Sequence, residues 1–369
     1  MSFESDSPAA VTYDAVVETG GGESEYVSFE AADDAEVVEQ VAEIEATVGL
    51  VTEIGEQAEV GILDVTPADD PRYGGSPPGG GQQKTALEQA MFHNAWSNDA
   101  DGAGVVVAVV DTGVQSHPDL ASNLLPGADL VGDAGAACGD PNGHGTHVAG
   151  ILGQVDNTTG GIGGAPSVKI LPVRVLGANG NGASATVAAG IDWAVANGAD
   201  VINLSLGAPS AGTMATAVNK AVAAGVTVVA AAGNCGDPAN LPTSQCGSPP
   251  QLNALTYPAA LDNVIAVGAV TTGQVARASF SNKNDYVDIA APGTNIDSTL
   301  NDAGYGPKSG TSMATPFVSA VAALMLSDCD LIPADVLSQI ASTGSPTVTG
   351  FANFPMKLLN AAAASTACV

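Results

Sequence analysis

The chain has few basic and few aromatic side chains. Of its 369 residues, 9 are Lys or Arg against 39 Asp or Glu, which gives a formal net charge of −30, and 4% are aromatic. A protein this acidic is repelled by nucleic acids and by anionic membranes, so neither is expected as a partner. No apolar run reaches the roughly 18 residues of a membrane span. The opening MSFESDSPAA lacks the basic and apolar regions of a signal peptide, which we expect to be absent or already removed.

Basic residues are missing altogether from positions 1–70, which hold 19 acidic ones. This bias ends at PRYGGSPPGGGQQ, residues 71–83, whose Gly and Pro content is typical of a linker. We therefore expect a small acidic domain at 1–70, a linker at 71–84 and a larger domain at 85–369.

Cysteine is also scarce. The five cysteines include no C-x-x-C pair, so a structural zinc site is not expected. Cys235 and Cys246 flank a Gly- and Pro-rich loop and are predicted to form a local disulfide. Cys329 and Cys368 would form a second one, which leaves Cys138 over. Disulfides persist in oxidising compartments, so this usage favours a secreted, extracellular protein over the alternative of a cytoplasmic one.

The small acidic domain combines strand and helix patterns. Apolar residues recur at helical spacing across 33–49, where an Asp at the start can cap the helix. Apolar runs before and after it predict strands at 11–18, 51–56 and 59–65. Together these patterns predict a separate α+β unit.

The larger domain shows near-continuous apolar runs separated by helical patterns. Runs of this kind are typical of parallel strands that are buried on both faces. They lie at 104–110, 168–176, 199–206, 225–233 and 263–270. We therefore predict a three-layer αβα domain with a mostly parallel central sheet, in which a site forms beyond the carboxyl ends of the strands.

Four polar residues stand where such a site would form. Asp111 and Asn234 each follow a buried strand, and His144 and Ser312 each stand at the start of a helix. By itself, each has a structural explanation as a helix cap, a packed imidazole or a turn residue. Together, an Asp, a His and a Ser are what nucleophilic acyl transfer requires, because the imidazole takes the hydroxyl proton and the carboxylate orients the imidazole. Asn234 would donate to the oxyanion.

Four short motifs occur in the order of a known family. VAVVDTGV, NGHGTHVAG, AAGN and SGTSMATP resemble the motifs of the subtilisin-like serine proteases, the subtilase family, and the likeness covers residues 82–345. It implies a serine endopeptidase that needs no cofactor for catalysis, with Asp111, His144 and Ser312 as its triad and Asn234 in its oxyanion hole. Because the first His of HGTH matches the family's base, His147 is expected to be structural.

The resemblance also implies a groove for an extended polypeptide. LGANGNG and SLG match the two edges that pair with a substrate strand, a mode of binding called β-augmentation. The pocket for the side chain before the cleaved bond would have uncharged walls, so apolar residues would be preferred there. The implied substrate-binding residues are Gly180, Gly182, Ser205, Leu206, Gly207, Gly233 and Thr256.

The acidic domain resembles the family's propeptide. This resemblance implies a monomeric zymogen that is inhibited by its own N-terminal region in cis and cuts itself within residues 65–86. HPDL at 117–120 and QVDNTTGG at 154–161 resemble a calcium site of the family. Asp119 and Asn157 would be side-chain ligands of a structural Ca2+ there.

Three other interpretations fit parts of the sequence. GNGASA at 180–185 matches a dinucleotide-binding pattern, which also requires an acidic residue about twenty residues later, at the carboxyl end of a strand. Asp200 stands at that spacing, but it is at the start of a predicted strand. Asp111, His144 and His147 would form a metal site, although no H-E-x-x-H motif is present and the serine motif is left unexplained. A binding protein that kept the fold without activity would not need all four catalytic groups.

Overall fold

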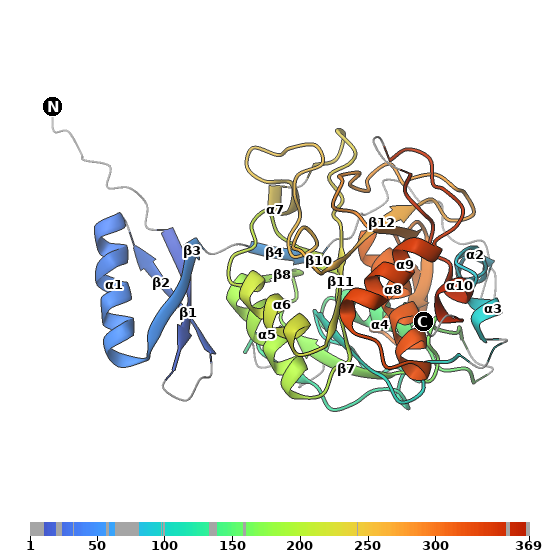
Figure 1. Ribbon diagram of the computed structural model, residues 1–369, viewed down its shortest axis with the longest axis horizontal. Helices are drawn as coiled ribbons and strands as arrows, with labels where there is room; N and C mark the ends of the chain where they lie inside the picture. The colour runs from blue at the N-terminus through green and yellow to red at the C-terminus, as the bar shows by residue number, and fades with distance from the viewer. Residues whose placement is uncertain are drawn as a thin grey trace.

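The computed structural model places the small acidic domain beside one face of a larger α/β domain (Figure 1). The predicted linker at 71–84 lies outside the described residues up to residue 80, and helix α2 begins at Gly81. The residues that the structure describes are 11–19, 24–31, 33–56, 59–62, 81–96, 98, 100–132, 139–157, 160–241, 243–351 and 355–366.

A sheet of seven parallel strands forms the centre of the larger domain within these ranges. Its order is β13-β12-β11-β9-β5-β7-β6, and all neighbouring strands run parallel. The apolar runs that predicted the sheet are buried on both faces, which confirms the three-layer fold. The strands are β5 (Val106–Asp111), β6 (Ala128–Asp129), β7 (Lys169–Arg174), β9 (Val201–Leu204), β11 (Thr227–Ala231), β12 (Ile265–Val270) and β13 (Ile289–Pro292).

Helices cover both faces of the sheet, and each face has its own hydrophobic core. α5 (Ser184–Ala196) and α6 (Met214–Ala223) lie on one face, and α4 (His144–Gly153) and α8 (Thr311–Asp328) lie on the other (Figure 1). The remaining elements are α2 (Gly81–Gln89), α3 (Phe92–Trp96), α7 (Thr243–Cys246), α9 (Pro333–Thr343), α10 (Ala361–Ser365) and the hairpin of β14 (Ile296–Thr299) and β15 (Tyr305–Lys308).

No single helix in the described ranges has the length and hydropathy to span a membrane, although the bent pair α8 and α9 meets those criteria jointly.

Three antiparallel strands and one helix make up the small domain. The strands are β1 (Val11–Glu18), β2 (Ser24–Ala31) and β3 (Leu50–Glu56), in the order β2-β1-β3. α1 (Asp34–Thr47) begins where the Asp33 carboxylate accepts from backbone N–H groups of the first turn. The sequence patterns predicted all of these elements except β2, whose SEYVSFEA has too few apolar residues to stand out.

Polar side chains join the sheet of the small domain to α5 and α6, while α1 covers its far side (Figure 1). Tyr26 Oη donates to Asp192 Oδ2 at 2.6 Å, and Ser184 Oγ donates to Asp14 Oδ2 at 2.7 Å. Burial, together with the bond to Asp192, raises the pKa of the Tyr26 phenol, so this group stays a donor. Two further hydrogen bonds join Thr216 to Glu53 and Lys220 to Ser24.

The local disulfide predicted from the sequence is present. Cys235 and Cys246 are bonded, with their Cα atoms 5.6 Å apart. Cys329 is also disulfide-bonded. Its partner lies outside the described residues, as do Cys138 and Cys368, so the pairing of Cys329 with Cys368 stays a prediction.

Candidate active site

Asp111 and His144 meet at the carboxyl end of the central sheet. Asp111 is the last residue of β5 and His144 the first of α4, and both side chains are fully buried. Asp111 Oδ1 accepts from His144 Nδ1 at 2.8 Å and from the N–H of Thr112 at 2.7 Å. Because an ionised carboxylate can only accept, Nδ1 carries the proton and Nε2 is the basic nitrogen of the ring.

Glycines on both sides of His144 let α4 approach β5. A Cβ at Gly145 would lie 2.1 Å from the carbonyl oxygen of Gly113 and 3.2 Å from Asp111 side-chain atoms. Gly143 has a φ of 90°, in the left-handed region that favours glycine. The G-H-G sequence is therefore what allows the imidazole to reach Asp111.

Ser312 is the second residue of α8 and is held by Ser205. Ser312 Oγ donates to the carbonyl of Ser205 at 3.0 Å, and Ser205 Oγ donates to the carbonyl of Ser312 at 2.9 Å. In a regular helix that second carbonyl would accept from the N–H of residue 316, but Pro316 has none. The proline therefore leaves the Ser312 carbonyl open to Ser205, which ties the start of α8 to the end of β9.

Asn234 lies just after β11, and Thr311 orients its side-chain amide. Asn234 Oδ1 accepts from the backbone N–H of Thr311 at 3.0 Å and from its hydroxyl at 3.1 Å. Asn234 Nδ2 is buried and has no hydrogen-bond partner among the described residues. An unsatisfied buried donor is costly unless a ligand accepts from it, so this N–H2 group suits a negatively charged oxygen of a substrate. The sequence analysis did not identify Thr311, although it directly precedes Ser312.

β4 (Glu59–Ile62) of the N-terminal region lies between two edge strands of the larger domain (Figure 1). These are β8 (Asn181–Ala183) and β10 (Leu206–Gly207), and β4 is antiparallel to both. The two segments predicted to form the edges of a groove thus both pair with an extended backbone.

Gly180 and Gly182 are required by the backbone of the larger domain itself. Gly180 has a φ of 80° in a turn, where its N–H donates to the carbonyl of Gly177 at 2.9 Å. A Cβ at Gly182 would lie 2.5 Å from the carbonyl oxygen of Val175. Gly182 does pair with Val60 of β4, but its missing side chain makes room for Val175 and not for the paired strand.

Gly233 and Thr256 lie together beside Asn234. Gly233 has a φ of 103°, and a Cβ there would lie 2.2 Å from Thr256 Oγ1. Asn282 donates from Nδ2 to the carbonyl of Ala232 at 2.8 Å and to Thr256 Oγ1 at 3.3 Å. The sequence analysis missed Asn282, because a single Asn in FSNKND belongs to no motif that could have found it. It links Ala232 to Thr256 through hydrogen bonds and adds no charge.

His147 takes part in packing and not in the Asp111–His144 pair. It is fully buried, and its Nε2 donates to the carbonyl of Gly306 at 3.0 Å. Burial, reinforced by the charge of Lys308, lowers the pKa of the imidazole to about 3, so the ring is neutral near pH 7.

The alternative of a metal site at Asp111, His144 and His147 is not supported. No group of three or more His, Cys, Asp and Glu side chains in the described ranges is arranged to hold a metal ion.

Asp119 and Asn157 lie together, but donors face the buried carboxylate of Asp119. The carboxylate accepts from the side-chain amides of Asn157 and Gln154, each at 2.8 Å, from the N–H of Gly161 at 3.1 Å and from the hydroxyl of Tyr305 at 3.2 Å. A calcium ion requires oxygen ligands directed at it. The structure thus brings the two predicted side-chain ligands together, and the calcium site itself stays a prediction.

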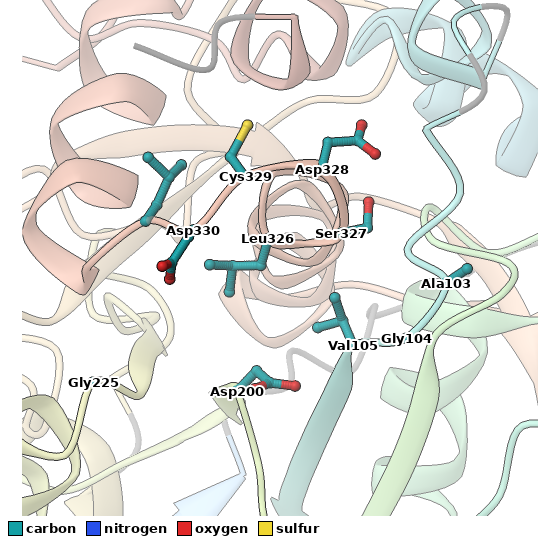
Figure 2. Close-up of a pocket in the computed structure, with 11 residues that line it drawn as sticks. Ala103, Gly104, Val105, Asp200, Gly225, Leu326, Ser327, Asp328, Cys329 and Asp330 are labelled. Atoms are coloured by element: carbon teal, nitrogen blue, oxygen red, sulfur yellow. The ribbon is translucent and has the colours of Figure 1, made fainter.

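A cavity of about 520 Å³ lies at the opposite edge of the central sheet (Figure 2). Val105 and Asp200, which line it, precede β5 and β9, and the other wall is the end of α8. Asp200 Oδ2 accepts from the N–H of Val106 at 2.8 Å. This structural role of Asp200, at the amino end of β9, argues against the dinucleotide-binding interpretation. The cavity lies at the amino ends of β5 and β9, whereas Asp111 is at the carboxyl end of β5.

We expect His147 to make folding sensitive to acid. Its pKa is about 3 in the folded chain against 6.5 for the unperturbed imidazole, so the unfolded chain binds the additional proton and the free energy of unfolding falls as the pH drops from 6.5 toward 3. In His147→Gln the neutral amide can still donate a hydrogen bond but cannot take up the proton. Between about pH 4 and 6, the slope of the free energy of unfolding against pH should therefore be smaller than in wild type by about 1.4 kcal/mol per pH unit. Denaturant titrations measure it, and equal slopes in the two proteins would contradict the assignment.

Known proteins are similar to this chain over the part that carries the site. A model of the subtilase family matches residues 102–348. Subtilisin DY of Bacillus licheniformis is 44% identical over 250 residues, which cover 67% of this chain and 85% of that protein. Subtilisin BL of Lederbergia lenta is 46% identical over 225 residues, which cover 61% and 77%.

A solved structure agrees with these relatives. The crystal structure of a cold-adapted subtilisin-like serine proteinase matches with a TM-score of 0.62 and 38% identity, over 71% of this chain and 90% of that one. The matched region includes the strand ends and helix starts that carry Asp111, His144, Asn234 and Ser312. The chain therefore belongs to the subtilase family and is a subtilisin-like serine endopeptidase.

Proposed function

We propose that this chain hydrolyses peptide bonds with Asp111, His144 and Ser312 as its catalytic triad and with Asn234 in its oxyanion hole. One observation carries the proposal. At a single edge of the sheet, buried Asp111 fixes the tautomer of His144 at 2.8 Å. At the same edge, Thr311 ties Asn234 to the turn that presents Ser312.

Each group has one task in this mechanism. His144 Nε2 takes the proton of Ser312 Oγ as the oxygen attacks the substrate carbonyl carbon, and then gives it to the leaving amine. Asp111 stays ionised and stabilises the imidazolium. The oxyanion accepts from Asn234 Nδ2 and from a backbone N–H at the start of α8, where the helix dipole also favours negative charge. Water, activated by the same imidazole, then releases the acyl group from the serine.

The small acidic domain acts as a propeptide in this proposal. β4 takes the place of a substrate strand, paired through its backbone to β8 and β10. The contacts of Tyr26 with Asp192 and of Asp14 with Ser184 dock the rest of the domain on the neighbouring helices. While β4 stays in place, no other polypeptide can pair with the same edges, so the N-terminal region inhibits the enzyme in cis.

The register of β4 indicates where the chain is first cut. Ile62, the last residue of β4, lies opposite Leu206 in an antiparallel pair, and Leu206 directly follows Ser205. The carbonyl of Ser205 accepts from Ser312 Oγ. The C-terminal end of β4 therefore lies beside the segment that holds Ser312, which supports a first cut in the chain beyond Ile62, where the sequence predicts cleavage within residues 65–86. Residues 63–80 lie outside the described part of the chain.

Loss of the nucleophile and loss of one oxyanion donor should differ in size. Ser312→Ala should lower kcat about a millionfold and Asn234→Ala about a hundred- to a thousandfold, because the second variant keeps its nucleophile. Both magnitudes correspond to those known for subtilisin itself. Peptide hydrolysis with and without a chelator provides the measurement. Equal losses in the two variants, or hydrolysis abolished by the chelator, would count against these roles.

Self-processing should depend on Ser312. Wild-type protein should shorten to a form whose new N-terminus lies within residues 65–86, whereas purified Ser312→Ala should keep its full mass. Intact-mass and N-terminal peptide analysis distinguish the two. If the purified serine variant were trimmed at the same bond, another protease would be responsible.

The pocket for the residue before the cleaved bond is uncharged. In this proposal its walls are Ser205–Gly207, Ala232–Cys235 and Thr256, as the family resemblance implies, and none of these residues carries a charge. A Lys or Arg of the substrate would bury its charge there without a partner, at a cost of several kcal/mol. The net charge of −30 attracts basic peptides at long range, but salt screens that attraction beyond about 10 Å. Local desolvation therefore decides, and it favours apolar residues.

Cleavage of a peptide library should accordingly select Leu, Met or Phe before the cut bond. Thr256→Asp would place a carboxylate in the pocket and should shift the preference toward Lys and Arg. Sequencing of the products reports both profiles. A wild-type profile dominated by Arg or Lys would refute the description of the pocket.

We also propose that the enzyme works outside the cell as a monomer. The Cys235–Cys246 disulfide favours an oxidising compartment, and the strong negative charge keeps copies apart and away from nucleic acids. Cell fractionation and sedimentation test the two statements, which an intracellular or oligomeric protein would contradict.

A further inference from the structure

We propose that Asp140 and Thr112 are positioning residues that hold the Asp111–His144 pair in register. The inference rests on the proposed function, in which that pair activates Ser312. It concerns a buried hydrogen-bond network to which neither the sequence analysis nor the mechanism above assigns a role.

Asp140 is buried and accepts hydrogen bonds at both carboxylate oxygens. Oδ1 accepts from the N–H groups of Asn142 and Gly143, at 3.2 and 2.8 Å. Oδ2 accepts from the N–H and the hydroxyl of Thr146, at 2.8 and 2.6 Å. These donors lie before and within the first turn of α4, so the carboxylate clamps the backbone on both sides of His144.

Thr112 connects this clamp to the strand that carries Asp111. Its hydroxyl donates to Asp140 Oδ1 at 2.8 Å and accepts from the N–H of Gly145 at 3.0 Å. Its own backbone N–H donates to Asp111 Oδ1 at 2.7 Å. Thr112 therefore contacts Asp111, Asp140 and the residue after His144 at once.

The hydrogen-bond network fixes the angle at which α4 starts, and with it the position of His144 relative to Asp111. The close packing of α4 does not fix this angle alone. Gly145 and Gly143 have no side chain to set the angle at which the helix starts. Hydrogen bonds are directional, and here they define that angle on the two sides of His144. A displacement of about 1 Å at a catalytic group can cost about a hundredfold in rate.

The charge of Asp140 is balanced by the helix and not by a cation. No Lys or Arg forms an ion pair with it in the described ranges. The N–H groups at the start of a helix carry partial positive charge and stabilise an anion there. A charged carboxylate makes stronger hydrogen bonds than a neutral acceptor, which suits a clamp.

The test compares three substitutions at Thr112 with a matched control. Thr112→Val removes the hydroxyl at nearly constant volume, Thr112→Ala removes it without a branched side chain, and Thr112→Ser keeps it. Thr227→Val is the control, because Thr227, at the start of β11, is likewise buried and its hydroxyl has no partner among the described residues. Fully processed enzyme is used, and the measurements are kcat, KM, the melting temperature and the fraction of sites that an organophosphorus reagent labels.

We expect Thr112→Val and Thr112→Ala to lower kcat about ten- to a hundredfold per labelled site. KM should change by less than about twofold, since in the described ranges neither Thr112 nor Asp140 hydrogen-bonds to β8 or β10. Thr112→Ser should restore kcat to within about threefold, and the control should match wild type.

A purely structural role would lower the melting temperature and the number of labelled sites but leave kcat per site unchanged, and that result overturns the inference. A kcat per labelled site in Thr112→Ser that is no higher than in Thr112→Val also overturns it. If the wild-type enzyme neither hydrolyses peptides nor reacts with the reagent, the proposed function itself fails, so the two failures are distinguishable.

Discussion

The close packing of α8 through the core is the constraint on which the active site depends. This helix is buried from Thr311 to Met325, between α4 and the strands of the central sheet. Its neighbours come close because the residues between them are small. A Cβ at Gly164, for example, would lie 2.7 Å from Ala320 and 2.8 Å from Phe92. A core of this kind has room for few aromatic rings, which agrees with their 4% share of the sequence.

The N-termini of α4 and α8 lie at the same edge of the sheet and have different roles. At α4, Asp140 binds backbone N–H groups of the first turn and the segment before it, so this terminus is satisfied internally and holds His144. At α8, the capping residue is Gly310, Asn234 Oδ1 accepts from the N–H of Thr311, and Asn234 Nδ2 beside it is buried without a partner among the described residues. Donors left without a protein acceptor are what a developing oxyanion needs. The fold thus closes one terminus and leaves the other for substrate.

The sequence was sufficient for the parts of the structure with a strong local signal. The apolar runs gave the parallel sheet, and the polar residues at their ends led to Asp111 and Asn234. Thr112, Thr311 and Asn282 were not predicted, because each acts through partners distant in sequence. Asp140 binds the nearby residues 142–146, but the sequence analysis recognised no motif that includes it. Gly182 was identified, but for a different reason from the one the structure shows, since its clash partner, Val175, is known only from the fold. β2 was missed because its polar face leaves little alternation to detect.

The central claim is that Ser312 is the nucleophile, activated by a base that Asp111 orients. Covalent labelling tests it most directly. Processed enzyme is treated with an organophosphorus reagent and digested, and the modified peptide is identified by mass spectrometry. The account predicts one adduct per chain, on Ser312, and none in Asp111→Asn over the same time because the imidazole then loses its orienting carboxylate. An active preparation that stays unlabelled, or that carries the adduct on another residue, would contradict it.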